Sequence, residues 1–117
     1  MIQKIRLLSI VLVFTFFLQP IVAQSAGWFS CEVEEIMEFQ TRVHVKCTNS
    51  INILGNNISF LAIDKSDPDE LERFVSYATT ALALSYYFRV WVPNAASAMG
   101  NCQSTNCRTP TSFGVRR

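Results

Sequence analysis

The residues best suited to acid–base chemistry lie within one short stretch of the chain. His44 is the only histidine, and histidine serves proteins as a general base or a metal ligand near neutral pH. Paired carboxylates, which perform glycoside hydrolysis, are available just before it at Glu32, Glu34, Glu35 and Glu38. The alternation of this stretch favours a solvated, charged surface strand instead, with His44 exposed and paired with Glu34.

No reactive partner accompanies these groups. The serines lie in no nucleophile-elbow pattern, and the four glycines are scattered instead of grouped in a phosphate-binding loop. The gap of sixteen residues between Cys31 and Cys47 differs from the tight cysteine pairs of zinc sites. The sequence therefore predicts a protein that is not an enzyme and that holds no metal or other cofactor.

A second set of residues is suited to binding. Tyr87, Arg89 and Trp91 alternate with apolar residues and share one side of a predicted strand, and Gln103 and Asn106 follow in the short segment "CQSTNC". Aromatic side chains offer flat apolar area at low entropic cost, and a shaped polar loop suits recognition. We interpret these five residues as ligand-binding. In the alternative, "GWF" (27–29) or the loop covers the two aromatic rings.

The N-terminal segment indicates export. Lys4 and Arg6 precede an apolar run that ends in small residues, as in secretory signal peptides. The run is short for a membrane anchor and contains a proline. Cleavage after Ala23 or after Ser25 fits the pattern. We predict a signal peptide at residues 1–25, with no stable membrane span after its removal.

The remaining residues, 26–117, are sufficient for one small domain, and such domains bury little more than ~60% of their unfolded surface. All four cysteines lie there, and an even number in a short exported chain indicates disulfides. We predict the pairs Cys31–Cys47 and Cys102–Cys107, and a secreted or periplasmic location.

Net charge excludes one class of partner. The chain has 10 Lys and Arg and 9 Asp and Glu. Removing Lys4 and Arg6 leaves 8 basic residues against 9 acidic ones, a net charge of −1. Nucleic-acid binders carry a basic footprint, which this domain lacks. The partner is therefore expected to be a glycan or a protein.

Residues 29–50 predict a β-hairpin whose turn centres on Phe39. A constant register then places Cys31 opposite Cys47, Val33 opposite Val45, Glu32 opposite Lys46 and Glu34 opposite His44. One register therefore gives a disulfide, an apolar pair and two acid–base pairs at once, so covalent, hydrophobic and electrostatic patterns all favour the same hairpin. The doubled glutamate predicts a β-bulge, which would shift the pairs nearer the turn.

One helix follows the third predicted strand (58–64), after a polar connection (48–57). Asp67 is the expected N-cap and Pro68 the first helical residue. The apolar stripe at helical spacing consists of Leu71, Phe74, Val75, Ala78 and Leu82.

Two further strands are expected at residues 86–93 and 111–115, with Phe88, Val90 and Val92 on the core side. Three strands, a helix and two strands are the order of an OB-fold, so we predict a mostly β protein with one helix that forms a small five-stranded OB-fold-like barrel. The alternative is an α+β open antiparallel sheet with one covering helix.

The layout of the whole exported chain resembles the receptor-binding B subunits of subtilase-cytotoxin and pertussis-like toxins. The likeness lies in the strand-rich first half, the helix ending in "ALALSYYFRVWVP" and the C-terminal "NCQSTNC". A group of small exported bacterial proteins of uncharacterised function shows the same helix-then-strand pattern. The resemblance implies an OB-fold, a possible homo-oligomer and an exported binding module for glycans. The alternative function is a periplasmic structural or enzyme-inhibitor protein.

Overall fold

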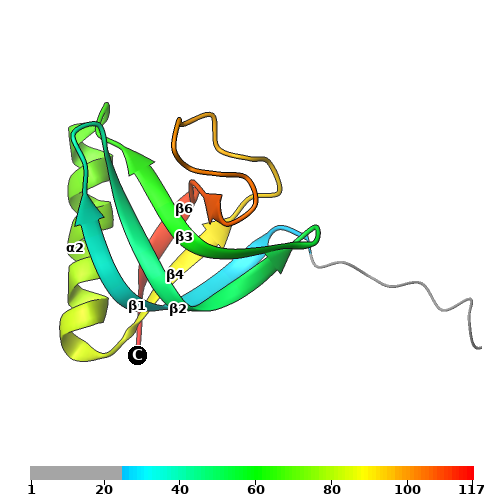
Figure 1. The fold of residues 1–117 in the computed structure, drawn as a ribbon. Coiled ribbons are helices and arrows are strands. Elements are labelled where there is room, and N and C mark those ends of the chain that lie inside the picture. The colour runs from blue at the N-terminus through cyan, green and yellow to red at the C-terminus, as the bar shows by residue number, and fades with distance from the viewer. Residues whose placement is uncertain (1–24) are drawn as a thin grey trace, which may run out of the picture.

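The computed structural model of the protein describes residues 25–117 (Figure 1). The predicted signal peptide, residues 1–25, lies outside the described residues except for Ser25. In chain order the elements are β1 (Gly27–Glu38), β2 (Arg42–Ile53), β3 (Asn56–Asp64), α2 (Pro68–Leu84), β4 (Tyr87–Val92), β5 (Cys107–Arg108) and β6 (Ser112–Arg116).

The strands form one sheet in the order β5-β3-β2-β1-β4-β6, which curls into a half-barrel beside α2 (Figure 1). All neighbours pair antiparallel except β3 and β5. The two outermost strands, β5 and β6, are separated by only three residues, 109–111, so one short segment connects both edges of the sheet. The mostly β fold with one helix is confirmed; the fifth predicted strand corresponds to β6, and β5 is a sixth strand that the sequence did not predict.

Alternating burial explains most of the strands. In β4, Phe88, Val90 and Val92 are buried, and the residues between them lie on the outer side, as predicted. The predicted polar connection at residues 48–57 is wrong, because β2 continues to Ile53 and turns directly into β3. Leu54 and Gly55 both have positive φ angles, 51° and 89°, as a tight hairpin turn requires.

The helix begins as the sequence predicts. The Asp67 carboxylate accepts hydrogen bonds from the backbone N–H groups of Asp69 and Glu70, and Pro68 occupies the first turn. Its buried residues are Phe74, Ala78 and Ala81, whereas Leu82, which we predicted to be part of the apolar stripe, is 43% exposed. Within the described residues, no helix is long and apolar enough to cross a membrane.

Strand β1 changes its partner along its length. Its first half pairs with β4, from Gly27 opposite Val92 to Glu32 opposite Tyr87, and its second half pairs with β2. The predicted bulge lies at the change, between Val33 and Glu35. One strand thereby belongs to both halves of the curled sheet.

The predicted register of the hairpin is wrong, chiefly because its turn is not centred on Phe39. Glu38 lies opposite Val43 and the Phe39 N–H donates to the Arg42 carbonyl, so the turn centres between residues 40 and 41. The bulge then shifts the register by one residue, and Val33 lies opposite Cys47 instead of Val45. The Glu34 carboxylate is 3.2 Å from the Lys46 ammonium group, so Glu34 is paired with Lys46 and not with His44.

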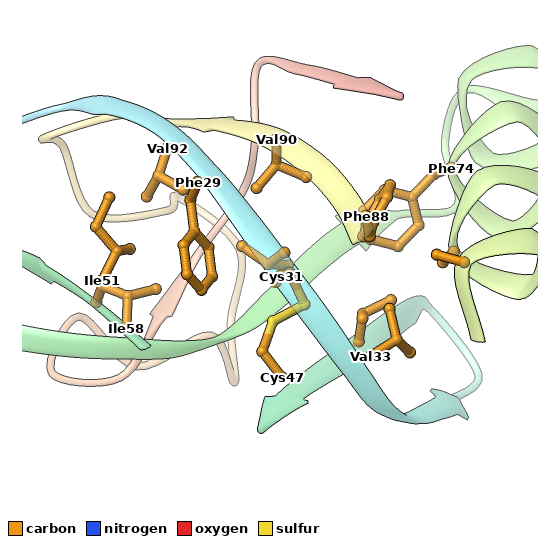
Figure 2. Close-up of a cluster of buried hydrophobic side chains, with 14 of the residues drawn as sticks. Phe29, Cys31, Val33, Cys47, Ile51, Ile58, Phe74, Phe88, Val90 and Val92 are labelled. Carbon is orange, nitrogen blue, oxygen red and sulfur yellow. A yellow bond between two sulfur atoms is a disulfide. The ribbon is translucent and has the colours of Figure 1, made fainter. Parts of the chain in front are cut away.

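The core lies inside the curl, with the Cys31–Cys47 disulfide among buried side chains such as Phe29, Val33 and Val90 (Figure 2). Phe74 of α2 packs edge-on against Phe88 and Phe113, which attaches the helix to β4 and β6. Both predicted disulfides, Cys31–Cys47 and Cys102–Cys107, are present, with Cα–Cα distances of 5.4 and 5.1 Å.

A side chain replaces the missing strand pairing where β1 leaves β2. The Asn49 carboxamide accepts a hydrogen bond from the Glu32 N–H (2.9 Å) and donates one to the Ser30 carbonyl (2.8 Å). These are the backbone groups that a paired strand would otherwise satisfy. Asn49 therefore connects β2 to β1 at the point where the two strands separate.

The two disulfides should contribute unequally to stability. Loop-entropy arguments give roughly 3 kcal/mol for the sixteen-residue Cys31–Cys47 separation and roughly 2 kcal/mol for the five-residue Cys102–Cys107 separation. Urea unfolding of the Cys31→Ala/Cys47→Ala and Cys102→Ala/Cys107→Ala proteins measures both values. An equal or larger loss for the second pair would contradict this ranking.

Asn49→Ala should lower the free energy of unfolding by about 1–3 kcal/mol, because it leaves a strand donor and a strand acceptor without partners. Asn49→Asp retains the acceptor for Glu32 and loses the donor to Ser30. Hydrogen exchange of the Glu32 amide should therefore accelerate in Asn49→Ala and not in Asn49→Asp. Equal protection of this amide in all three proteins would contradict the bridging role.

Candidate functional site

The predicted binding residues of β4 belong to a surface built from three strands. Opposite Trp91 lie Trp28 of β1 and Ser112 of β6; opposite Arg89 lie Ser30 and Gly114; opposite Tyr87 lie Glu32 and Arg116. Each of these residues alternates with an inward-facing neighbour in its strand. We call these nine residues the strand face.

Two indole rings and one guanidinium group form the centre of the strand face. The rings of Trp28 and Trp91 are 5.6 Å apart between centroids and nearly perpendicular, at 81°. The Arg89 guanidinium lies 5.4 Å from the centre of the Trp28 ring, and its Nη1 donates a hydrogen bond to the Ser30 hydroxyl at 2.9 Å. These contacts hold the three side chains in a fixed arrangement.

The arrangement is accessible to solvent. Trp28 is 50% exposed and Tyr87 is 42% exposed, while Arg89 and Trp91 are half-buried. No atom lies within 4 Å of the position that a Cβ at Gly114 would occupy, so the surface is open beside Arg89. The "GWF" segment therefore covers Trp91 only in part, and its own Trp28 adds to the exposed aromatic area.

Gln103 and Asn106, the other two predicted binding residues, lie in a different group. They line a hollow of about 230 Å³ together with His44, Phe60, Asn101 and Cys107. The hollow is bounded by the outer side of β2 and β3 and by the disulfide-closed loop. We call it the loop hollow. The structure thus brings Tyr87, Arg89 and Trp91 together on β4 and places Gln103 and Asn106 with residues of β2 and β3.

His44 differs from its predicted state. It is only 7% exposed, and its Nε2 accepts a hydrogen bond from the Arg42 Nε at 3.0 Å. The Phe39 ring packs edge-on against the imidazole and also lies 4.3 Å from the Arg42 guanidinium. Burial, and secondly the charge of Arg42, lower the pKa of His44 below its usual 6.5. Both effects favour the neutral imidazole.

Two of the four glutamates considered for glycoside hydrolysis make ordinary surface ion pairs. Glu34 pairs with Lys46, and Glu38 pairs with Lys65 at 2.6 Å, a hydrogen bond that lowers the pKa of the exposed Glu38 carboxyl. Among residues 25–117, no group of three or more His, Cys, Asp and Glu side chains is arranged to hold a metal ion.

Sequence reasoning missed two functional candidates, Trp28 and Phe60. Trp28 was considered only as a cover for Trp91, although its place next to the inward-facing Phe29 indicates an outward position. Phe60 lies in a strand that is apolar on both sides, so the pattern did not show that its outer side borders a loop.

The lowered pKa of His44 predicts pH-dependent stability. The folded protein disfavours the imidazolium that the unfolded chain forms freely, so stability is full above pH 6.5 and falls as the pH decreases below it. The urea midpoint should therefore fall between pH 7 and about pH 5.5. Because His44 is the only histidine, His44→Gln should flatten this dependence. An unchanged slope in the variant would contradict the assignment.

No protein-family model, no curated protein and no solved structure matches this chain. The resemblance to toxin B subunits therefore stays a prediction from the sequence. The strand face and the loop hollow are the features from which we infer function.

Proposed function

We propose that this protein is an exported, non-catalytic binding module that recognises a glycan or a protein partner through the strand face. The observation that carries the proposal is the ordered group of Trp28, Arg89 and Trp91 on an accessible sheet surface. Aromatic rings stack on the apolar faces of sugars, and the neighbouring cation and hydroxyl supply hydrogen bonds. Glycans and protein partners both bind to exposed aromatic surfaces of this kind.

The same residues support the alternative, a periplasmic structural or enzyme-inhibitor protein. Tryptophan, tyrosine and arginine dominate the binding energy of protein interfaces, and the strand face contains all three. Two disulfides in so short a chain favour an oxidising compartment, either secreted or periplasmic. The toxin-like layout adds the proposal of a homo-oligomer, which light scattering of the purified protein would measure.

Trp28→Ala and Trp91→Ala should each weaken binding by roughly tenfold or more, as expected for central aromatic residues of a binding surface. A glycan array and a cell-envelope pull-down with the exported protein identify the ligand class. Leu54→Ala is the matched control, since Leu54 is an exposed apolar residue of the β2–β3 turn that belongs to neither the strand face nor the loop hollow.

Each variant must retain both disulfides and the circular dichroism spectrum of the native protein. Binding of a glycan supports the first function, and binding of an envelope protein supports the alternative. A ligand that both tryptophan variants bind as tightly as the native protein does would overturn the strand face as the site. Silence in both assays would overturn the proposed function itself.

A further inference from the structure

We propose that the loop hollow is a second binding site and that it takes a single neutral sugar ring. It shares with the proposed function the premise that the protein is a binding module, but it is built from other residues. Its lining consists of the carboxamides of Asn101, Gln103 and Asn106, the ring of Phe60, His44 and the disulfide cysteine Cys107.

The lining has the chemistry of a receptor for neutral hydroxyl groups. A carboxamide donates and accepts hydrogen bonds at the same time, as each sugar hydroxyl does, so amides match vicinal hydroxyls. The phenyl ring of Phe60 offers an apolar surface to the C–H side of a pyranose. No acidic side chain, lysine or arginine lines the hollow, and the lowered pKa of His44 keeps its imidazole uncharged. Arg42 bonds to His44 and Arg108 bonds to loop carbonyls, so neither guanidinium belongs to the lining.

The three carboxamides are not used by the fold. Within the described residues, four other carboxamides bond to the protein, since Asn49 bonds to β1, Asn52 to Asn57 and Gly55, and Asn94 to the Ala26 N–H, whereas those of Gln40 and Asn56 do not. In the same part of the chain, the side chains of Asn101, Gln103 and Asn106 form no hydrogen bond with protein. Their donors and acceptors are thus available to a ligand.

The backbone that carries them is rigid. The Gln103 carbonyl accepts hydrogen bonds from the N–H groups of Asn106 and Cys107, and the Asn106 carbonyl accepts them from Ser59 and Phe60 of β3. The Cys102–Cys107 disulfide closes the loop. A wall fixed before binding loses little entropy when the ligand enters.

The buried Arg108 also restrains the loop. Arg108 is only 3% exposed, and its Nη1 donates to the carbonyls of Ser104 (2.5 Å) and Cys107 (2.8 Å). Its Nε has no hydrogen-bond partner among the described residues. The guanidinium thus bonds to loop carbonyls and to no carboxylate, which indicates that its contribution is to the shape of the loop.

The size of the hollow limits the ligand. About 230 Å³ lies below the ~300 Å³ at which pockets for drug-sized ligands begin. One pyranose ring is a suitable occupant, and the open side leaves room for the rest of a glycan outside.

The test uses ¹⁵N-labelled exported protein, with both disulfides formed, titrated with the methyl glycosides of glucose, galactose, mannose and N-acetylglucosamine. At least one glycoside should shift the backbone amide signals of Phe60, Gln103 and Asn106. Gln103→Ala/Asn106→Ala should weaken this binding by roughly tenfold or more, because it removes two hydrogen-bonding groups. Leu54→Ala, at an exposed residue of the β2–β3 turn that belongs to neither the strand face nor the loop hollow, is the control and should leave it unchanged.

The outcomes separate this proposal from the proposed function. Shifts confined to Trp28, Arg89 and Trp91 would place the sugar on the strand face, which overturns the loop hollow and supports the proposed function. No shift with any of the four glycosides would overturn the loop hollow alone, since the strand face is tested by its own ligand. Binding that survives Gln103→Ala/Asn106→Ala in a correctly folded protein would also overturn it.

Discussion

The change of partner within β1 is the constraint on which the rest of the structure depends. A single strand pairs with β4 in its first half and with β2 in its second, and the bulge between Val33 and Glu35 allows the bend. A strand that changes partner leaves unpaired backbone and a gap in the sheet. The Cys31–Cys47 disulfide and the Asn49 carboxamide both lie at this gap and close it. The curl of the sheet, and hence the buried core, follows from this change of partner and from the contacts that close the gap.

Both candidate surfaces are consequences of the same bend. The first half of β1 lies beside β4, which brings Trp28 next to Trp91 and Ser30 next to Arg89. The second half directs β2 and β3 to the other part of the half-barrel, whose outer side is covered by the loop that Cys102 and Cys107 close. A domain of this size gains little stability from burial. The two disulfides and a few side-chain hydrogen bonds supply part of the stability, so less of it depends on the outer residues of the strand face and the loop hollow.

The sequence predicted those features that depend on neighbours in the chain. Alternation identified the inner side of β4, the Asp67 cap located the helix start, and cysteine number and spacing predicted both disulfides. It failed where distant contacts decide. The hairpin register depends on where the turn is centred and where the bulge lies, and the exposure of Leu82 depends on how the helix rotates over the sheet. His44 is buried because Arg42 and Phe39 pack around it, which no strand pattern contains. The separation of Gln103 and Asn106 from β4 depends on the parallel pairing of β3 with β5, a strand of two residues.

Trp28 provides the physical reason for giving the strand face a role beyond folding. In "GWF", alternation places one of two adjacent aromatic residues inside and the other outside, and Phe29 is the buried one. Burying a large apolar side chain contributes about 1.5–3 kcal/mol, which a half-exposed indole only partly gains. A polar residue at this position would preserve the pairing with β4, because that pairing uses backbone groups alone. The cross-strand contacts of Trp28 with Trp91 and Arg89 add to the stability of the sheet, but half of the indole stays exposed to solvent. The recognition of a ligand that we propose would account for the residue type, its exposure and its orientation together.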